Sequence, residues 1–212
     1  MKKVLLFIAL CAATILQAQT MNVEQQSVAA GELSHRLAVW AQGGMSTRLE
    51  LIGQLSDSGY TPSGCGAIGI GYQLGRGKFL LTTGLEFLNL NYTYSWIDPS
   101  PKQHYRPCHL GYLQIPVLLG MELPDWYWQI GGKLSYAVMQ VGNETVTPFR
   151  IAPAGEIGMT FDRWSRPSPV GYKLAFFAEC GLLGKKDSYT PRWIKEDFSI
   201  GLKFTVAYEF RK

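Results

Sequence analysis

Charge is scarce in this chain. Asp, Glu, Lys and Arg make up 17% of its 212 residues and apolar residues make up 47%, whereas a typical soluble domain is about 25% charged. The formal net charge of +4 falls by two if Lys2 and Lys3 are removed with an N-terminal leader. A nearly neutral chain lacks the basic surface that nucleic-acid binding requires, so we expect no nucleic-acid partner.

Long hydrophobic runs are missing after residue 19. No later segment offers the roughly 18 uncharged apolar residues that a membrane-spanning helix needs, which excludes a helical membrane protein. The chain also has no metal-ligand spacing, no P-loop and no GxGxxG motif after a strand. Its three histidines, His35, His104 and His109, do not stand in a His-x-Ser arrangement. We therefore expect no enzyme activity, no cofactor and no metal.

Residues 1–18 have the features of a signal peptide. Two lysines precede an apolar run, Val4–Leu16, and Ala18 suits cleavage, which leaves residues 19–212 as the mature barrel. The run is too short to cross a bilayer as a helix. The alternative is a lipoprotein modified at Cys11, but that cysteine lies in the middle of the run.

Alternation of apolar and small or polar residues dominates the mature chain. In Phe198–Phe210 every even position is apolar, and the odd positions are Ser, Gly, Lys, Thr, Ala and Glu. Successive side chains of a strand face opposite sides, so such a segment predicts a strand with one apolar face. The phase slips after Phe87, which a β-bulge would explain, and a first strand near Arg36–Gly43 has the weakest pattern. The other alternating segments are Cys65–Leu74, Phe79–Tyr94, His109–Leu123, Trp126–Gln140, Ile151–Asp162 and Val170–Leu182.

A soluble β-sandwich would also alternate, but it would carry more charge. The polar faces here are mostly Gly, Ala, Ser and Thr, which suits the narrow interior of a barrel. Glycine (23 residues) and aromatic residues (13%) are abundant. We therefore predict an all-β fold, a transmembrane antiparallel up-and-down β-barrel of about eight strands in the outer membrane of a Gram-negative bacterium.

Short and long connections alternate, as they do between the periplasmic turns and external loops of such barrels. The predicted short ones are Gly75–Gly77, Pro124-Asp125 and Arg163–Ser168, and the long ones are Gly44–Gly64, Ile97–Pro107, Gly142–Arg150 and Gly184–Glu196. Aromatic residues fall near the strand ends and predict two interfacial girdles. The periplasmic girdle would contain Tyr72, Phe79, Trp126, Trp128, Trp164, Tyr172, Tyr208 and Phe210, and the external one Tyr92, Tyr94, Trp96 and Trp193.

The stretch Gly111–Leu119 reads GYLQIPVLL, and a glycine-rich stretch, Gly131–Tyr136, opens the next predicted strand. With these motifs the chain resembles small outer-membrane β-barrels of the PorT-like or OmpA-like kind. The resemblance covers nearly the whole mature chain, and its specific part is the strand around Ile115-Pro116. It departs at the C-terminus, where two basic residues follow Phe210. A PorT-like barrel implies a helper role in export or envelope assembly.

Strand parity places several charged residues inside the barrel. Those near its middle are Glu86, Lys133, Glu156, Glu179 and Lys203, and those nearer the periplasmic mouth are Arg36, Glu122, Asp162, Lys173 and Glu209. An unpaired buried charge costs several kcal/mol, so we expect a structural ion-pair network. A proton or ion path, or a catalytic pair of carboxylates, stays open as the alternative.

Cys65 and Cys108 point inward near the external mouth by the same parity. The periplasm is oxidising, but one strand separates the two cysteines, so a disulfide is left open. Cys180 would face lipid as an apolar residue. Cations in the external loops could contact lipopolysaccharide phosphates or be ordinary solvated charges. They are Lys102, Arg106, Arg150, Lys185, Lys186, Arg192 and Lys195.

Three functions are compatible with these features. The first is a structural or adhesion-type barrel, monomeric, whose partners are outer-membrane lipids and lipopolysaccharide. The second is an accessory subunit of export or envelope assembly. The third is a lipid A-modifying enzyme, which would need a nucleophile and a base near the outer leaflet.

Overall fold

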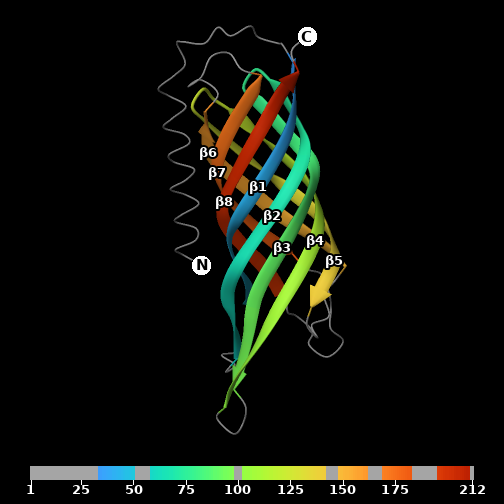
Figure 1. Ribbon diagram of the computed structural model, residues 1–212, viewed down its shortest axis with the longest axis vertical. Coiled ribbons are helices and arrows are strands. Elements are labelled where there is room, and N and C mark those ends of the chain that lie inside the picture. The colour runs from blue at the N-terminus through green and yellow to red at the C-terminus, as the bar shows by residue number, and fades with distance from the viewer. Residues whose placement is uncertain are drawn as a thin grey trace. The chain divides into compact units, whose positions relative to one another are not determined.

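Eight long strands form a closed barrel in the computed structural model of this protein, which describes residues 33–50, 58–97, 102–141, 148–161, 169–182 and 195–210. Every strand pairs antiparallel with its chain neighbours, and β8 closes onto β1 (Figure 1). The predicted up-and-down barrel is confirmed, while the predicted signal peptide lies outside the described residues. The strands are β1 Leu33–Glu50, β2 Ser58–Arg76, β3 Phe79–Ile97, β4 Gln103–Glu122, β5 Trp126–Val141, β6 Phe149–Thr160, β7 Val170–Leu182 and β8 Lys195–Phe210.

Several predicted boundaries were too short. The predicted loop Gly44–Gly64 is mostly strand, because β1 continues to Glu50 and β2 begins at Ser58. The predicted loop Ile97–Pro107 shrinks in the same way. Glycine, serine and proline in these stretches read as loop signals, but the cross-strand ladder continues through them. No helix within the described residues is long and apolar enough to cross a membrane.

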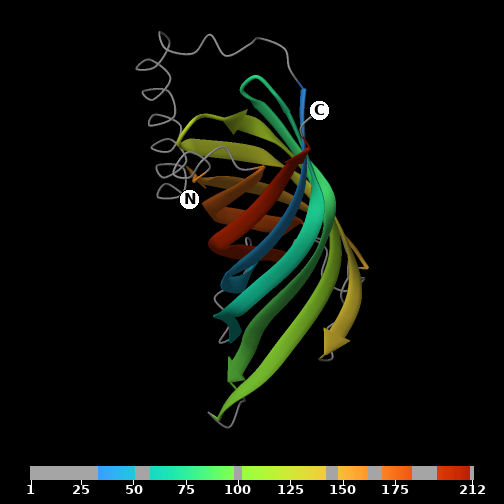
Figure 2. The same ribbon diagram turned by 45° about the horizontal axis from the view of Figure 1, so that its top comes forward.

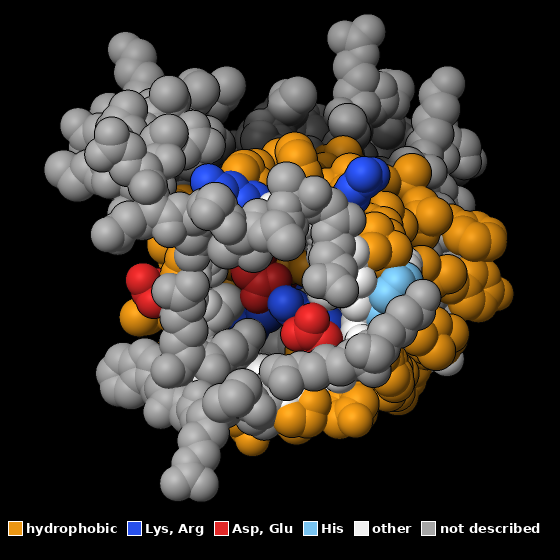
Figure 3. Space-filling view, turned by 90° about the horizontal axis from the view of Figure 1, so that it is seen from above, with side chains coloured by type: hydrophobic (Ala, Val, Ile, Leu, Met, Phe, Trp, Pro, Cys, Tyr) orange, Lys and Arg blue, Asp and Glu red, His pale blue; other side chains and the backbone are white. Residues whose placement is uncertain are grey.

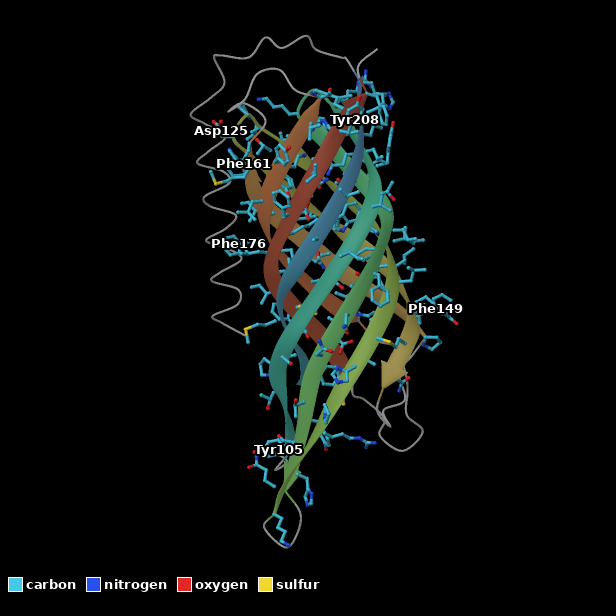
Figure 4. The ribbon with its side chains drawn as sticks, viewed as in Figure 1. Tyr105, Asp125, Phe149, Phe161, Phe176 and Tyr208 are labelled. Carbon is cyan, nitrogen blue, oxygen red and sulfur yellow. The ribbon has the colours of Figure 1, made fainter. Side chains whose placement is uncertain are left out.

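The apolar faces of the strands form the outside of the barrel. Ile68, Leu119 and Phe176 are 66%, 60% and 65% exposed, and Phe176 points away from the barrel in Figure 4. The residues that alternate with these outward positions point inward and are buried. Gln114 on β4 is an example, with an exposure of 0%. A barrel that is apolar outside and polar inside suits a lipid solvent.

The turns and bends use glycine. Gly77 has a φ of 60° and forms, with Lys78, a two-residue turn between β2 and β3; this turn lies one residue later than the predicted one centred on Arg76. Gly71 and Gly84 are paired across β2 and β3. A Cβ added at Gly71 would lie 2.2 Å from the Thr83 carbonyl oxygen. The missing side chains allow the sheet to bend tightly there, and Figure 2 shows the strands wrapping around the interior.

The polarity of the wall reverses near the loop end of three strands. We call residues 58–67, 88–97 and 103–112 the β2–β4 extension, whose outer part projects beyond the other strands in Figure 1. Inside it, Leu88, Leu90 and Leu110 are at most 2% exposed and belong to one apolar cluster. On the outside of the same strands lie polar residues such as Asn91 and His109. The inner cluster comprises Cys65, Ala67, Leu88, Leu90, Tyr92, Cys108, Leu110 and Tyr112.

The predicted phase slip after Phe87 is wrong. β3 keeps one parity, so Leu80, Glu86 and Leu90 all point inward. What changes is the chemistry of the two faces. From Leu88 toward the loop end, the apolar residues of β3 are on the inside. Irregularities in pairing lie elsewhere, on β2 between Pro62 and Gly66 and between β4 and β5 at Gly111 and Tyr112.

The aromatic girdles differ from the prediction at the external end. Tyr92 is 2% exposed and lies in the inner cluster, so it belongs to no girdle. Among the described residues, the large exposed aromatics at that end are Tyr136 and Phe149, whose ring centroids are 5.1 Å apart, and Tyr105 near the tip of the extension (Figure 4). At the turn end Tyr72, Phe79, Tyr172, Tyr208 and Phe210 are exposed. Trp164 and Trp193, and the side chain of Trp96, lie outside the described part.

The reversed polarity of the extension predicts the response to mutation. Leu90→Ala should lower the free energy of unfolding by about 2–5 kcal/mol, because it leaves a cavity in a packed cluster. Asn89→Ala, one residue away on the outer face, should change it by less than about 0.5 kcal/mol. Urea unfolding of the refolded barrel in detergent measures both. Equal losses would contradict the inward placement of Leu90.

Candidate functional site

The structure brings the five predicted mid-barrel charges together in the lumen, all of them buried. Lys133 Nζ lies 2.7 Å from Glu86 Oε1 and 2.9 Å from Glu179 Oε2. Lys203 Nζ lies 2.6 Å from Glu156 Oε2. The five side chains therefore form a triad and a pair, contributed by β3, β5, β6, β7 and β8.

Two residues missed by the sequence analysis extend the triad toward the loop end. Arg150 Nη1 lies 2.7 Å from Glu179 Oε1, and Arg150 Nε lies 3.9 Å from Asp197 Oδ2. The assignment of Arg150 to a loop was wrong, because β6 begins at Phe149 and its second residue points inward with 1% exposure. A Cβ added at Gly181 would lie 1.8 Å from Arg150 Nε, so this glycine makes room for the guanidinium. The sequence did contain a signal for this placement, because Arg150 alternates with Ile151, which points outward.

Trp40 connects the triad to the pair. Its indole Nε1 donates a hydrogen bond of 2.5 Å to Glu86 Oε2, and Lys203 Nζ lies 4.9 Å from the centroid of its ring. Added Cβ atoms at Gly69 and Gly71 would lie 2.4 and 2.8 Å from the ring atoms of Trp40. A large aromatic side chain can thus cross the middle of the lumen only because two inward positions of β2 have no side chain.

A second ion cluster lies at the turn end. Glu122 binds both Arg36 Nη1, at 2.6 Å, and Lys173 Nζ, at 3.0 Å. Glu209 Oε2 lies 3.6 Å from Arg36 Nε, and Lys173 Nζ lies 4.9 Å from the centroid of the Tyr127 ring. Figure 3, seen from this end, shows acidic and basic side chains inside an apolar ring. Asp162, predicted to join them, lies outside the described residues.

Neutral hydrogen bonds and packed side chains fill the lumen between these clusters. Gln73 Nε2 donates to Thr82 Oγ1, and Thr82 Oγ1 donates to Gln129 Oε1. Gln114 Nε2 donates 2.9 Å hydrogen bonds to Ser135 Oγ and Glu179 Oε1. The side chains with less than 2% exposure include Tyr112, Tyr127, Leu80, Leu118, Gln114 and Gln129. This arrangement holds the strands in register with ion pairs and hydrogen bonds.

Cys65 and Cys108 lie in the inner apolar cluster of the extension, on β2 and β4. The structure contains no disulfide between them, and β3 separates their strands. Cys180 lies on β7 with intermediate exposure. The predicted inward direction of Cys65 and Cys108 agrees with their exposures of 8% and 2%.

The outer face carries a second polar site, beside the β2 bulge. Asn91 Nδ2 donates a 2.7 Å hydrogen bond to the Gly64 carbonyl oxygen. Asn91 Oδ1 lies 2.6 Å from His109 Nδ1. The bulge leaves the Asn91 backbone without a β2 partner, and Ser46 Oγ donates to its carbonyl oxygen at 2.7 Å and accepts from its amide at 3.3 Å. Sequence alone did not find this site, because it depends on the bulge.

The remaining predicted polar residues are scattered. His35 hydrogen-bonds Tyr72 near the turn end, far along the strands from His104 and His109 on β4. Lys102 is exposed beside the start of β4. Within the described part of the chain, no three His, Cys, Asp or Glu side chains could hold a metal ion. Lys185, Lys186 and Arg192, and the side chain of Lys195, lie outside that part.

The shared carboxylate of Glu179 predicts a large effect of its loss. Glu179→Gln should lower the free energy of unfolding by about 3–5 kcal/mol, because Lys133 and Arg150 would be left as buried charges without full compensation. Glu209→Gln is the matched control at a more exposed pair and should cost less than about 1 kcal/mol. Urea unfolding in detergent measures both, and a Glu179→Gln barrel as stable as the control would refute the assignment.

No protein-family model matches this chain, and no curated protein matches it. Solved structures similar to it include the outer membrane protein OprG from Pseudomonas aeruginosa, at 11% identity and a TM-score of 0.46, covering 86% of this chain and 97% of that one. Neisserial surface protein A is similar at 11% identity and a TM-score of 0.45, with 82% and 97% covered. The outer membrane protein AlkL, solved in DMPC lipid bilayers, is similar at 11% identity and a TM-score of 0.45, with 90% and 96% covered.

Proposed function

We propose that this chain is an outer-membrane β-barrel with a structural or envelope-interaction role, filled inside and presenting its β2–β4 extension to the cell exterior. One observation carries the proposal: the exposed outer face is apolar around the barrel while the charged residues are paired inside it. In water this arrangement would expose large apolar side chains and bury charges, both at a cost. In lipid it costs little, because the bilayer solvates the outer face.

The two ends of the barrel support an orientation. At one end a two-residue turn, Gly77-Lys78, joins β2 and β3, which suits the short periplasmic turns of such barrels. At the other end the extension has a polar outer face and an apolar interior, the polarity of a protein in water. The extension therefore belongs on the outside, beyond the hydrocarbon layer.

The filled lumen favours a structural or interaction role over a wide pore. Eight strands enclose an interior just large enough for side chains, and here Trp40 crosses it between the Glu86 triad and the Lys203 pair. The surface that is left to meet other molecules is the outer wall and the extension. We assign the role of the protein to these surfaces, with the ion network as the support that keeps them rigid.

A charge placed on the outer face distinguishes lipid from water around the barrel. Phe176, 65% exposed at mid-height on β7 (Figure 4), should tolerate arginine in water within about 0.5 kcal/mol. In a bilayer, Phe176→Arg should cost about 2–4 kcal/mol, and Tyr208→Arg near the turn end about 0–1 kcal/mol. Unfolding titrations of both variants in lipid vesicles provide the measurement. Equal, small costs would contradict a membrane-spanning wall.

Membrane fractionation with gel mobility tests the same proposal in the cell. A folded membrane barrel should pellet with the envelope, resist carbonate extraction and change its gel mobility on boiling. Release of the mature chain by carbonate as a monomer that needs no detergent would remove the proposal.

The second candidate role, in export or envelope assembly, is favoured by the PorT-like stretch Gly111–Leu119. This stretch forms the middle of β4, with Ile115 and Val117 on the outer face at 48% and 46% exposure. Deletion of the protein should then block secretion of exported proteins, and complementation should restore it. Normal secretion in the deletion strain would leave the structural role alone.

A further inference from the structure

The outer polar site beside the β2 bulge lies where the apolar exterior ends. On β4, Leu113 is 39% exposed and lipid-like, and His109 stands four residues further toward the loop end. On β3 the polar outward residues begin at Asn89. At about 3.3 Å per residue, the stretch Leu88–Ile97 continues roughly 30 Å along the strand beyond this level. In the proposed orientation, this site lies at the headgroup layer of the outer leaflet.

The geometry of the site fixes the chemistry of His109. The Asn91 amide nitrogen donates to the Gly64 carbonyl oxygen, so its oxygen must face His109. A carbonyl oxygen only accepts, so His109 Nδ1 carries the hydrogen. Nε2 is then the nitrogen that remains to contact a ligand, as an acceptor when the ring is neutral and as a donor when it is protonated. These two hydrogen bonds, from Asn91 to Gly64 and between Asn91 and His109, form a relay that holds the imidazole in one orientation.

The bulge is what builds this relay. Three residues of β2, Ser63–Cys65, oppose two residues of β3 between the pairs Pro62↔Tyr92 and Gly66↔Asn89. This arrangement turns the Gly64 carbonyl toward Asn91, and Ser46 from β1 satisfies the Asn91 backbone. Bulges often re-aim a side chain beside a functional site. The backbone is thus arranged to present one ring on the outer face.

The charge of the surrounding face suits an anion. β2, β3 and β4 contain two acidic residues, Glu86 and Glu122, and both are held in the lumen by ion pairs. The outer face of the three described strands therefore offers no carboxylate to repel a phosphate. Next to acyl chains, the anionic group at this height is the phosphorylated sugar headgroup of the outer-leaflet lipid.

We propose that Asn91 and His109, positioned by the β2 bulge, form a recognition site for the phosphorylated glucosamine headgroup of lipopolysaccharide. This inference rests on the proposed membrane location and orientation. The imidazole Nε2 would hydrogen-bond the phosphate group, donating to a phosphate oxygen or accepting from a P–OH group, and Asn91 would hold the ring in place. The contact is on the wall of the barrel and does not depend on the external loops.

Binding of lipid A to the purified full-length barrel tests the site, with native mass spectrometry counting bound lipid. Diphosphoryl lipid A should bind more tightly than phosphatidylglycerol. His109→Ala should weaken diphosphoryl lipid A binding about fivefold or more, because the hydrogen bond between Nε2 and the phosphate is lost. His109→Lys, which offers an N–H donor to a phosphate oxygen, should restore most of the affinity. His35→Ala, at the other end of the barrel, is the matched control and should bind like wild type.

Each result decides the proposal. Equal affinity of His109→Ala and His35→Ala for diphosphoryl lipid A would overturn it, as would equal affinity of the wild-type barrel for phosphatidylglycerol. Asn91→Ala should lose affinity and also shift the His109 imidazole signals in NMR, because the hydrogen bond to Nδ1 is lost. A chain that shows no heat-modifiable mobility fails the membrane-barrel proposal before any lipid is added, so the two failures are distinct.

Discussion

The carboxylate of Glu179 is the group on which the interior of this barrel depends. Lys133, Arg150 and Gln114 all reach it, so one side chain of β7 is tied to β4, β5 and β6. A charge at 1% exposure is tolerable only with such partners. A slip of one residue in any of these strands would turn a partner to the outer face. The ion pairs therefore specify the register as well as stabilise it.

Small residues make room in the lumen for the large and charged side chains. Arg150 can reach Glu179 because Gly181 has no side chain, and Trp40 can cross the lumen because Gly69 and Gly71 have none. In a barrel of eight strands, each large inward side chain requires small neighbours. The abundance of glycine in this chain is therefore partly a packing requirement of the lumen.

Period-two alternation was enough to predict the barrel, its strand number and the inward direction of Glu86, Lys133, Glu156, Glu179 and Lys203. It failed where alternation alone cannot tell which face is inside. Leu88 and Leu90 were read as a change of phase, although the parity is constant and it is the chemistry of the two faces that changes. Arg150 was read as a loop residue because it stands one position inside a strand end. The relay between Asn91 and His109 was out of reach, since it depends on backbone pairing.

In the proposed membrane location, the reversal of polarity along β2, β3 and β4 follows from what lipid and water can each contribute to stability. Inside a bilayer, lipid tails are as apolar as leucine, so an apolar interior gains nothing from the hydrophobic effect. Ion pairs and hydrogen bonds hold the barrel there, as Lys133 and Glu179 do. Beyond the bilayer, water makes apolar burial favourable, and Leu88, Leu90 and Leu110 replace the charged residues inside the same wall.

One continuous sheet is thus stabilised by ion pairs and hydrogen bonds in one part and by apolar burial in the other. The sequence of the strands sets the level at which the first is replaced by the second. On the three long strands this level falls at Ala67, Leu88 and Tyr112, which are paired neighbours. The bulge at Ser63–Cys65 lies just beyond it. A regular ladder would leave no backbone group to orient a side chain on the outer face. In the proposed orientation, the break in the ladder lies where such a side chain would meet the boundary between lipid and water.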